Sequence, residues 1–412
     1  MNSLRRTLGT RDAVVIGLGS MIGAGIFSAL GPAAHAAGPW LLLALAVATV
    51  VAYCNATSTA RLAAVHPSSG GTYLYATRQL SPFWGYLAGW SFVVGKTASC
   101  AAMAMTVGAY AWPGREVPVA VATVAVATVV ALVALNCLGV QKSVALTRVI
   151  VTVVVLVLTV LVFSAWVLPA DHAPVAAAQA GALGVIQGAG LVFFAFAGYA
   201  RIATLGEEVR DPARTIPRAV PIALAIAFVV YALVAASALH VLGAGGLSAS
   251  TAPLLDVARS VAPGWLPAVV QVGAVLAATG SLLALVLGVS RTSLAMARDG
   301  HLPGALTTVS ESRGVPWVAE VAVGVLVVAL VLTVDLRGAI GFSSFGVLLY
   351  YALANASAFT LNPEQGRPAA WIPVTGLIGC LVLAVALPAA SVIGGAIVVA
   401  LGALVFVARR RG

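Results

Sequence analysis

The segment Ile16-Gly-Leu-Gly-Ser-Met-Ile-Gly-Ala-Gly-Ile-Phe27 decides how the rest of the chain is interpreted. It lies in an apolar stretch over residues 12–32, which is long enough to cross a bilayer, yet four of its twelve residues are glycine. Each glycine in a helix interior costs about 1 kcal/mol relative to alanine. Two interpretations are open: close packing of helices through small residues, or a helix broken at mid-membrane that offers its backbone to a ligand.

A second apolar stretch, over residues 183–203, is also interrupted by glycine at mid-length. It contains Phe193-Phe-Ala-Phe-Ala-Gly-Tyr199 and lies five apolar stretches after the first. Paired glycine-interrupted helices in corresponding positions are the sequence signature of transporters that are built from two inverted repeats. The pair therefore favours the broken-helix interpretation over simple packing.

The composition of the chain is that of a membrane protein. Of its 412 residues, 61% are hydrophobic and only 8% are charged, whereas a soluble domain has about 25% charged residues. A bilayer core requires roughly 20 apolar residues per helix, and helices satisfy the backbone hydrogen bonds that lipid cannot. We expect twelve transmembrane helices, over 12–32, 39–62, 82–111, 118–138, 144–168, 183–203, 219–242, 265–297, 317–334, 339–360, 371–388 and 390–408.

The distribution of positive charge predicts the orientation. If both termini are cytoplasmic, 18 of the 22 Lys and Arg residues fall on the cytoplasmic side and three fall outside, as the positive-inside rule requires. The net charge of +10 is scattered between apolar stretches and forms no single patch, which argues against nucleic-acid binding. We expect a multi-pass protein of the cell (plasma or inner) membrane with cytoplasmic termini.

Cysteine and histidine offer no catalytic or metal-binding pattern. The four cysteines lie inside apolar runs without metal-ligand spacing, and the five histidines lie near the ends of the predicted helices or in loops. An intramembrane enzyme would need a nucleophile–base pair or a cluster of such groups. We expect no enzyme activity, no metal and no cofactor. A channel or a receptor that senses a substrate stays open as an alternative to a transporter.

Five separated motifs resemble the amino acid–polyamine–organocation (APC) superfamily, and within it the bacterial amino acid permeases. They are Gly19–Phe27, His66–Tyr75, Phe194–Tyr199, Glu207–Arg218 and Ser290–Pro303. The resemblance implies an all-α, LeuT-like fold in a single transporter domain over residues 1–412. Its first inverted repeat would cover 12–168, its second 183–360, and two further helices 371–408.

The resemblance also implies where an amino acid binds. The substrate carboxylate would meet backbone N–H groups of Ala24 and Gly25, beyond a break at Gly23, because helix N-termini favour anions. The α-amino group would meet carbonyl groups near three residues, which are Met21, Phe194 and Ala197. Phe194 and Phe196 would form an aromatic gate; they are two residues apart and so point to different faces of a regular helix. We expect Phe194 to be the direct contact.

Lys96 carries a charge in the middle of the span over 82–111, where lysine costs at least about 2.5–3.5 kcal/mol. It could snorkel or pack between helices. Alternatively, it could select substrates with acidic or polar side chains, or carry a coupling proton. Resemblance to related antiporters places it near the substrate. The predicted substrate-binding residues are Met21, Gly23, Ala24, Gly25, Lys96, Cys100, Phe194 and Ala197.

Two positions depart from the pattern of the family. Ala200 stands where members of the family often have an acidic residue, and about Val154 stands where some proton-coupled members have lysine. The acidic residues fall in loops or near the ends of the predicted spans, and none falls clearly in the middle of a span. Glu320 is the residue whose position relative to a span end is least certain. The predicted function is secondary active transport of amino acids by alternating access, with a proton or a counter-substrate as possible coupling partner. An amine or polyamine carrier, or an exchanger or exporter without proton coupling, is the alternative.

Overall fold

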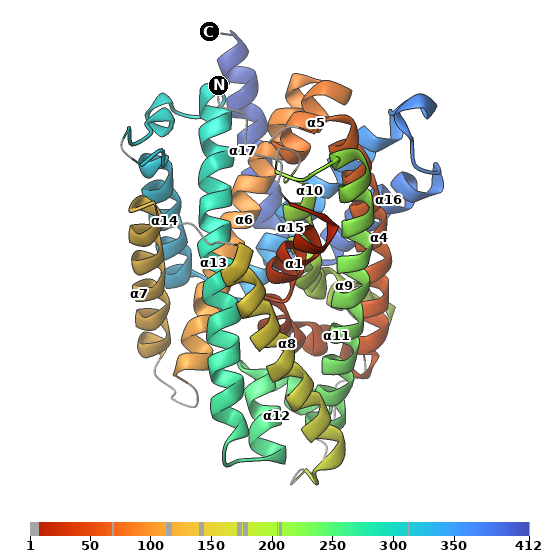
Figure 1. Ribbon diagram of the computed structural model, residues 1–412, viewed down its shortest axis with the longest axis vertical. Coiled ribbons are helices and arrows are strands. Elements are labelled where there is room, and N and C mark those ends of the chain that lie inside the picture. Colours follow the sequence, from red (N-terminus) through yellow and green to blue (C-terminus); the bar gives the residue numbers. More distant parts are fainter. Residues whose placement is uncertain are drawn as a thin grey trace.

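A computed structural model describes residues 8–67, 70–112, 118–139, 144–170, 175, 180–203, 205, 208–311 and 313–411. The described residues form helices, together with one isolated β-bridge between Leu8 and Val209. Figure 1 shows that the long helices run roughly along the longest axis of the molecule and form one bundle. The expectation of an all-helical fold is confirmed for this part of the chain.

The helices of the first half correspond to the first five predicted spans. The first two spans consist of α1 (Thr10–Met21), α2 (Ala24–Ser28), α3 (Leu30–Ala37), η1 (Gly38–Trp40) and α4 (Leu41–Val65). The short α5 (Gly71–Gln79) then precedes α6 (Pro82–Ala111), α7 (Pro118–Cys137) and α8 (Val144–Val167). Pro82 occupies the first helical position of α6, where its missing N–H costs nothing.

The second half begins with α9 (Ala182–Phe196), η2 (Ala197–Tyr199) and α10 (Ala200–Ala203). It continues with α11 (Pro212–Ala249), α12 (Pro253–Val261), α13 (Leu266–Arg298), η3 (Gly304–Thr307) and α14 (Trp317–Thr333). The last elements are α15 (Leu336–Phe359), η4 (Pro363–Gln365), α16 (Trp371–Ala386) and α17 (Ala389–Arg411).

Ten helical stretches among the described residues are long and apolar enough to cross a membrane. The remaining two of the twelve predicted spans coincide with α14 and α16, which are apolar but only 17 and 16 residues long. The protein is therefore a multi-pass membrane protein. The count of twelve spans, the single transporter domain and the division into two inverted repeats stay predictions.

The segments that connect the long helices lie at the two ends of the bundle, in the groups that the charge distribution predicts. In Figure 1, α5 and the C-terminal end of α17 lie at the upper end, whereas α12 lies at the opposite end. The sequence assigns the first two to the cytoplasmic side and α12 to the outside. The relative arrangement agrees with that assignment; the identity of the membrane and the cytoplasmic position of the termini stay predictions.

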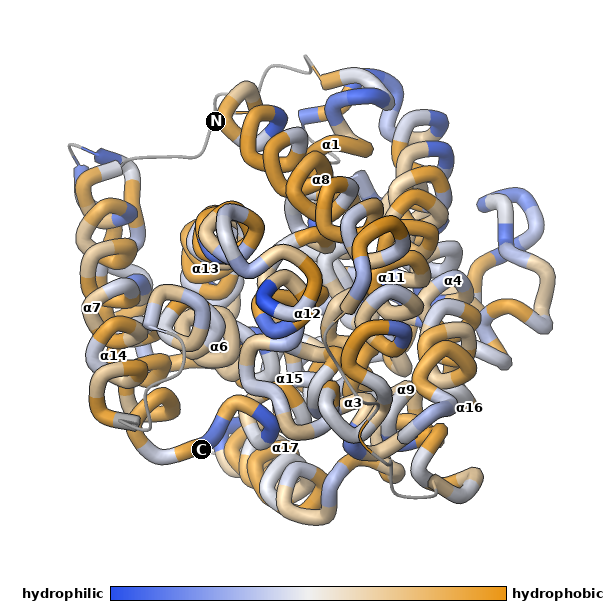
Figure 2. Tube along the Cα trace, turned by 90° about the horizontal axis from the view of Figure 1, so that it is seen from below, coloured by the Kyte–Doolittle hydropathy of each residue, from blue (hydrophilic) through white to orange (hydrophobic). Residues whose placement is uncertain are grey.

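Burial divides the helices into a centre and a rim. In the membrane-crossing stretch of α15, 78% of the residues are buried, and in that of α6 the share is 72%. In those of α7 and α17 only 22% of the residues are buried. Figure 2 shows apolar residues all along rim helices such as α7 and α8. Such an apolar rim suits a lipid environment, and α15 and α6 have the largest buried shares of the ten stretches.

Candidate functional site

The first span is broken where its glycines predict. Helix α1 ends at Met21 and α2 begins at Ala24. Between them Ile22 has a ψ of 53° and Gly23 a ψ of −140°, both outside the helical range. The first N–H groups of a helix have no partner within that helix. The start of α2, with Ala24 fully buried, therefore lies deep inside the bundle with N–H groups that have no partner within the helix.

The sixth span changes its winding and is not fully interrupted. Helix α9 ends at Phe196, three residues (Ala197–Tyr199) form the 3₁₀ turn η2, and α10 begins at Ala200. A 3₁₀ turn tightens the helix and redirects carbonyl groups away from the i→i+4 pattern. The interruption is milder than that in the first span.

The two interrupted spans pack backbone against backbone. A Cβ atom on Gly25 would lie 2.5 Å from the Cα atom of Ala195 in α9. A Cβ on Gly198 would collide with the carbonyl oxygen of Ser20. Glycine is therefore needed at both positions because the chains approach too closely for any side chain. The two interpretations of the glycines are therefore compatible: the helix is broken, and its glycines also allow close packing of the two spans.

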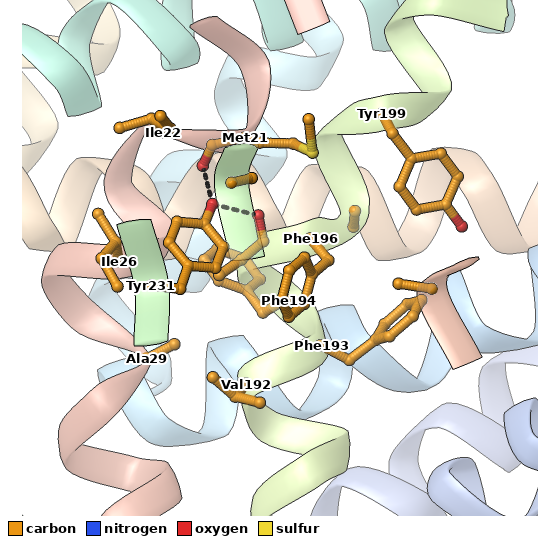
Figure 3. Close-up of a cluster of buried hydrophobic side chains, with 14 of the residues drawn as sticks. Met21, Ile22, Ile26, Ala29, Val192, Phe193, Phe194, Phe196, Tyr199 and Tyr231 are labelled. Atoms are coloured by element: carbon orange, nitrogen blue, oxygen red, sulfur yellow. Dashed lines mark hydrogen bonds between the residues drawn. The ribbon is translucent and has the colours of Figure 1, made fainter. Parts of the chain in front are cut away.

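Protein donors already occupy some of the carbonyl groups at the interruptions. The hydroxyl of Tyr231 lies 2.6 Å from the carbonyl oxygen of Met21 and 3.0 Å from that of Ala195, as Figure 3 shows. At the other interruption, the Ala197 carbonyl accepts from Lys96 Nζ at 3.2 Å and from the Tyr351 hydroxyl at 3.1 Å. The lysine at mid-span thus has a defined partner in the sixth span.

A cavity of about 270 Å³ lies between α1, α6, α9 and α13. Pockets for drug-sized ligands are about 300–1,000 Å³, so this volume suits a small solute. Its lining is Ser20, Gly70, Gly71, Tyr73, Phe92, Lys96, Ser99, Met103, Phe194, Ala197, Gly198, Ala200, Arg201, Glu208, Ser281, Ala284, Leu285, Gly288, Arg291, Thr292, Ala295 and Tyr350.

A family model described as "Amino acid permease" matches residues 8–407, nearly the whole chain. The chain belongs to the amino acid permease family. An uncharacterized transporter of Mycobacterium tuberculosis is 62% identical over 411 residues, which cover 99% of this chain and 92% of that protein. The family and the names of the relatives make the protein a transporter and not an enzyme.

More distant relatives carry substrate names. The chain is 27% identical to the branched-chain amino acid permease BcaP of Bacillus subtilis, over 88% of this chain and 82% of that protein. It is 29% identical to cationic amino acid transporter 4 of Homo sapiens, over 89% of this chain and 61% of that protein. These two names describe different substrates, so they do not assign one to this permease.

Three of the predicted site residues line the cavity of the permease: Lys96, Phe194 and Ala197. The side chains of Lys96 and Phe194 are each 7% exposed. The structure brings together a cation from α6, an aromatic ring from α9 and a carbonyl group from η2. Their roles toward a substrate stay predictions.

The other predicted residues lie behind the cavity wall. They are Met21, Gly23, Ala24, Gly25, Cys100 and Phe196, which are absent from the lining. The ring of Phe196 is fully buried and packs on Tyr231 with 5.0 Å between centroids. Gly25 faces Ala195, and a Cβ on Gly23 would collide with the Ser281 hydroxyl. In this conformation these residues shape the wall and do not touch the cavity.

Sequence reasoning named no residue of α13 as a substrate-binding residue, although this helix forms one wall of the cavity. Lining residues on α13 include Ser281, Ala284, Gly288, Arg291 and Ala295. Their spacing of three or four residues places them on one face of the helix. This stripe of small and polar residues, which ends in an arginine, is a signal that the sequence contains. It is recognisable only when one knows that α13 borders a cavity.

The described lining carries more positive than negative charge. Lys96, Arg201 and Arg291 are cations, and Glu208 is the carboxylate among the described lining residues. The structure places Arg201 and Arg291 on the wall of the cavity. Of these cations Lys96 is buried, whereas Arg201 and Arg291 are exposed.

Proposed function

We propose that this permease is a secondary active transporter that moves amino acids across the membrane by alternating access, with the substrate in the central cavity. The cavity borders both interrupted spans, which is where transporters of inverted-repeat architecture bind their substrates. In this proposal the α-carboxylate approaches the start of α2, at Ala24 and Gly25, and Phe194 covers the substrate. Reaching the start of α2 requires the wall between α2 and α9 to open during the transport cycle.

The substrate class follows from Lys96. Its ammonium group donates to the Ala197 carbonyl at 3.2 Å, which is one of the carbonyl groups that the family resemblance offers to the substrate's own α-amino group. A second cation next to this ammonium would be repelled, whereas an acidic or polar acceptor would be attracted. We therefore propose substrates with an acidic or polar acceptor side chain, and rejection of cationic amino acids.

The same observation disfavours the alternative of an amine or polyamine carrier. A polyamine would have to enter a cavity whose described lining has three cations and one carboxylate. It would also lack the carboxylate that suits a helix N-terminus. The name of the human relative points to cationic substrates, but the charge of this cavity gives no support for them here.

Counterflow in liposomes tests the proposal. Liposomes that contain the purified permease and are loaded with an unlabelled amino acid should exchange it for labelled acidic or polar amino acids. Arginine or lysine should inhibit this exchange only weakly. Lys96→Met should raise inhibition by cationic amino acids at least about tenfold, equivalent to ~1.4 kcal/mol. Lys142→Met, at the other lysine of the chain, is the matched control and should behave like the wild type. Efficient uptake of arginine by the wild type would refute the proposed substrate class.

A further inference from the structure

One carboxylate of the permease is fully enclosed within the helical bundle. Glu320 lies in the first turn of α14, and its exposed fraction is 0%. The sequence placed it near a helix end, where a side chain usually reaches water. The structure instead turns it inward, against α7 and α13.

Side chains from two other helices hold the carboxyl group. The Ser290 hydroxyl of α13 lies 2.6 Å from Oε1, and the Asn136 amide of α7 donates to Oε2 at 3.2 Å. The same Asn136 amide also donates to the Leu283 carbonyl at 3.3 Å. Glu320 therefore ties three helices together at one point.

The protons of this cluster can be counted. The Ser290 oxygen lies within hydrogen-bonding distance of two acceptors, Glu320 Oε1 at 2.6 Å and the Leu287 carbonyl oxygen at 3.0 Å. A serine hydroxyl has one proton and can donate to only one of them. If Glu320 is protonated, it donates to Ser290, and Ser290 donates to Leu287, so both contacts are hydrogen bonds. The protonated carboxyl therefore makes one more hydrogen bond in this cluster than the ionised carboxylate does.

The surroundings supply no ion pair for an ionised carboxylate. Among the residues that the structure describes, no cation lies within ion-pair distance of Glu320. The groups that interact with it electrostatically are Cys100 on α6, Cys137 on α7 and Arg291 on α13, and Arg313 donates to the Cys137 carbonyl at 3.3 Å. The helix N-terminus helps an anion only slightly, whereas burying an unpaired carboxylate costs far more.

The cluster adjoins the substrate cavity through α13. Ser290 is buried, and the next residue, Arg291, lines the cavity. Arg291 is a cation of the described chain that interacts electrostatically with Glu320. The proton on Glu320 and the guanidinium of Arg291 are then two alternative ways to neutralise the same charge.

We infer that Glu320 is a proton-binding site of the permease and that its proton is the coupling proton of transport. The carboxyl holds the proton in the conformation described here. It releases the proton to water in the cavity when Arg291 replaces it as the counter-charge. The coupling part of this inference rests on the proposed transport function, whereas proton binding does not. It also gives the proton a carrier other than Lys96 and the absent groups at Ala200 and Val154.

Infrared difference spectroscopy tests proton binding without transport. Spectra of the purified permease at mildly acidic and mildly alkaline pH should show a protonated-carboxyl band that is absent in Glu320→Gln. The isosteric amide keeps a donor for Ser290 and an acceptor for Asn136. Glu364→Gln, at an exposed glutamate, is the matched control and should retain the band. Ser290→Ala keeps the carboxyl but removes its partner, so the band should shift in frequency. A wild-type spectrum without a band assignable to Glu320 would overturn the inference.

Two liposome assays test coupling. Counterflow measures exchange without a gradient, and a pH gradient that is acidic outside measures driven accumulation. In Glu320→Gln the ratio of driven accumulation to counterflow should fall at least about fivefold, the lower end of typical coupling between sites. Glu364→Gln should keep the wild-type ratio. An unchanged ratio in Glu320→Gln overturns the coupling role. Absence of counterflow in the wild type refutes the proposed function instead, and the infrared result still decides proton binding.

Discussion

The interruptions of the first and sixth spans look alike in the sequence but differ in what surrounds them. The carbonyl group of Met21, at the first break, accepts from the buried Tyr231, and Gly25 packs on Ala195. Ala197, at the second break, lies on the cavity wall, and its carbonyl accepts from Lys96. One break is enclosed by protein and the other borders the cavity. Glycine at mid-helix therefore predicts a break, but not whether a ligand can reach it.

The largest expected effect separates the two phenylalanines that precede the second break. Phe196 is fully buried against Tyr231, and Phe194 lines the cavity. Phe196→Ala should lower the stability of the permease by about 3–5 kcal/mol, as for other buried aromatic residues. Phe194→Ala should cost less stability but weaken substrate binding. Thermal unfolding in detergent, with and without substrate, measures both. If Phe194→Ala is the less stable variant and binds normally, the assignment of the two faces is wrong.

The next effect tests whether Gly25 serves packing. A methyl group there meets the backbone of Ala195 at 2.5 Å, so Gly25→Ala should overpack the contact and cost about 1–3 kcal/mol even without substrate. Gly288→Ala is the matched control, because its Cβ would meet no atom within 4 Å and alanine favours a helix. Thermal unfolding of the ligand-free variants measures the loss of stability. Wild-type stability of Gly25→Ala combined with lost binding would show that the glycine serves the ligand alone.

The smallest effect compares the two tyrosines that donate to the breaks. Tyr231→Phe removes the one hydroxyl proton that lies within reach of the Met21 and Ala195 carbonyl oxygens and should cost about 0.5–1.5 kcal/mol. Tyr351→Phe should cost less, because Lys96 still donates to the Ala197 carbonyl. The double variant Tyr351→Phe with Lys96→Met should then lose more stability than the two single variants together, because the two residues share an acceptor. Strict additivity would contradict a shared role at Ala197.

Some of the candidate site could be predicted from the sequence because its signals are local. Lys96 stands out because a charge at mid-span is costly wherever the helix packs, and the structure places it on the cavity wall. Phe194 and Phe196 are two residues apart and so must point to different faces, which the structure confirms. The four glycines of an otherwise apolar span favoured a break at Gly23, which the structure confirms.

Other features could not be predicted because they depend on which helix lies opposite. The α13 face from Ser281 to Ala295 becomes a cavity wall only through its position beside α6 and α9. Glu320 could equally have pointed to water from the first turn of α14. Its burial follows from the approach of Asn136 and Ser290, which are 184 and 30 residues away along the chain.

The sequence by itself determined that this protein is a helical membrane protein of the amino acid permease family with two interrupted helices. Those properties follow from hydrophobicity, glycine content and short motifs, each of which acts over one helix. Tertiary structure alone decided which carbonyl groups border the cavity, which glycines serve contacts between helices, and that three of the four charged residues in the described lining are cations. These depend on distances between helices far apart in the chain, and the packing of side chains across those distances sets them.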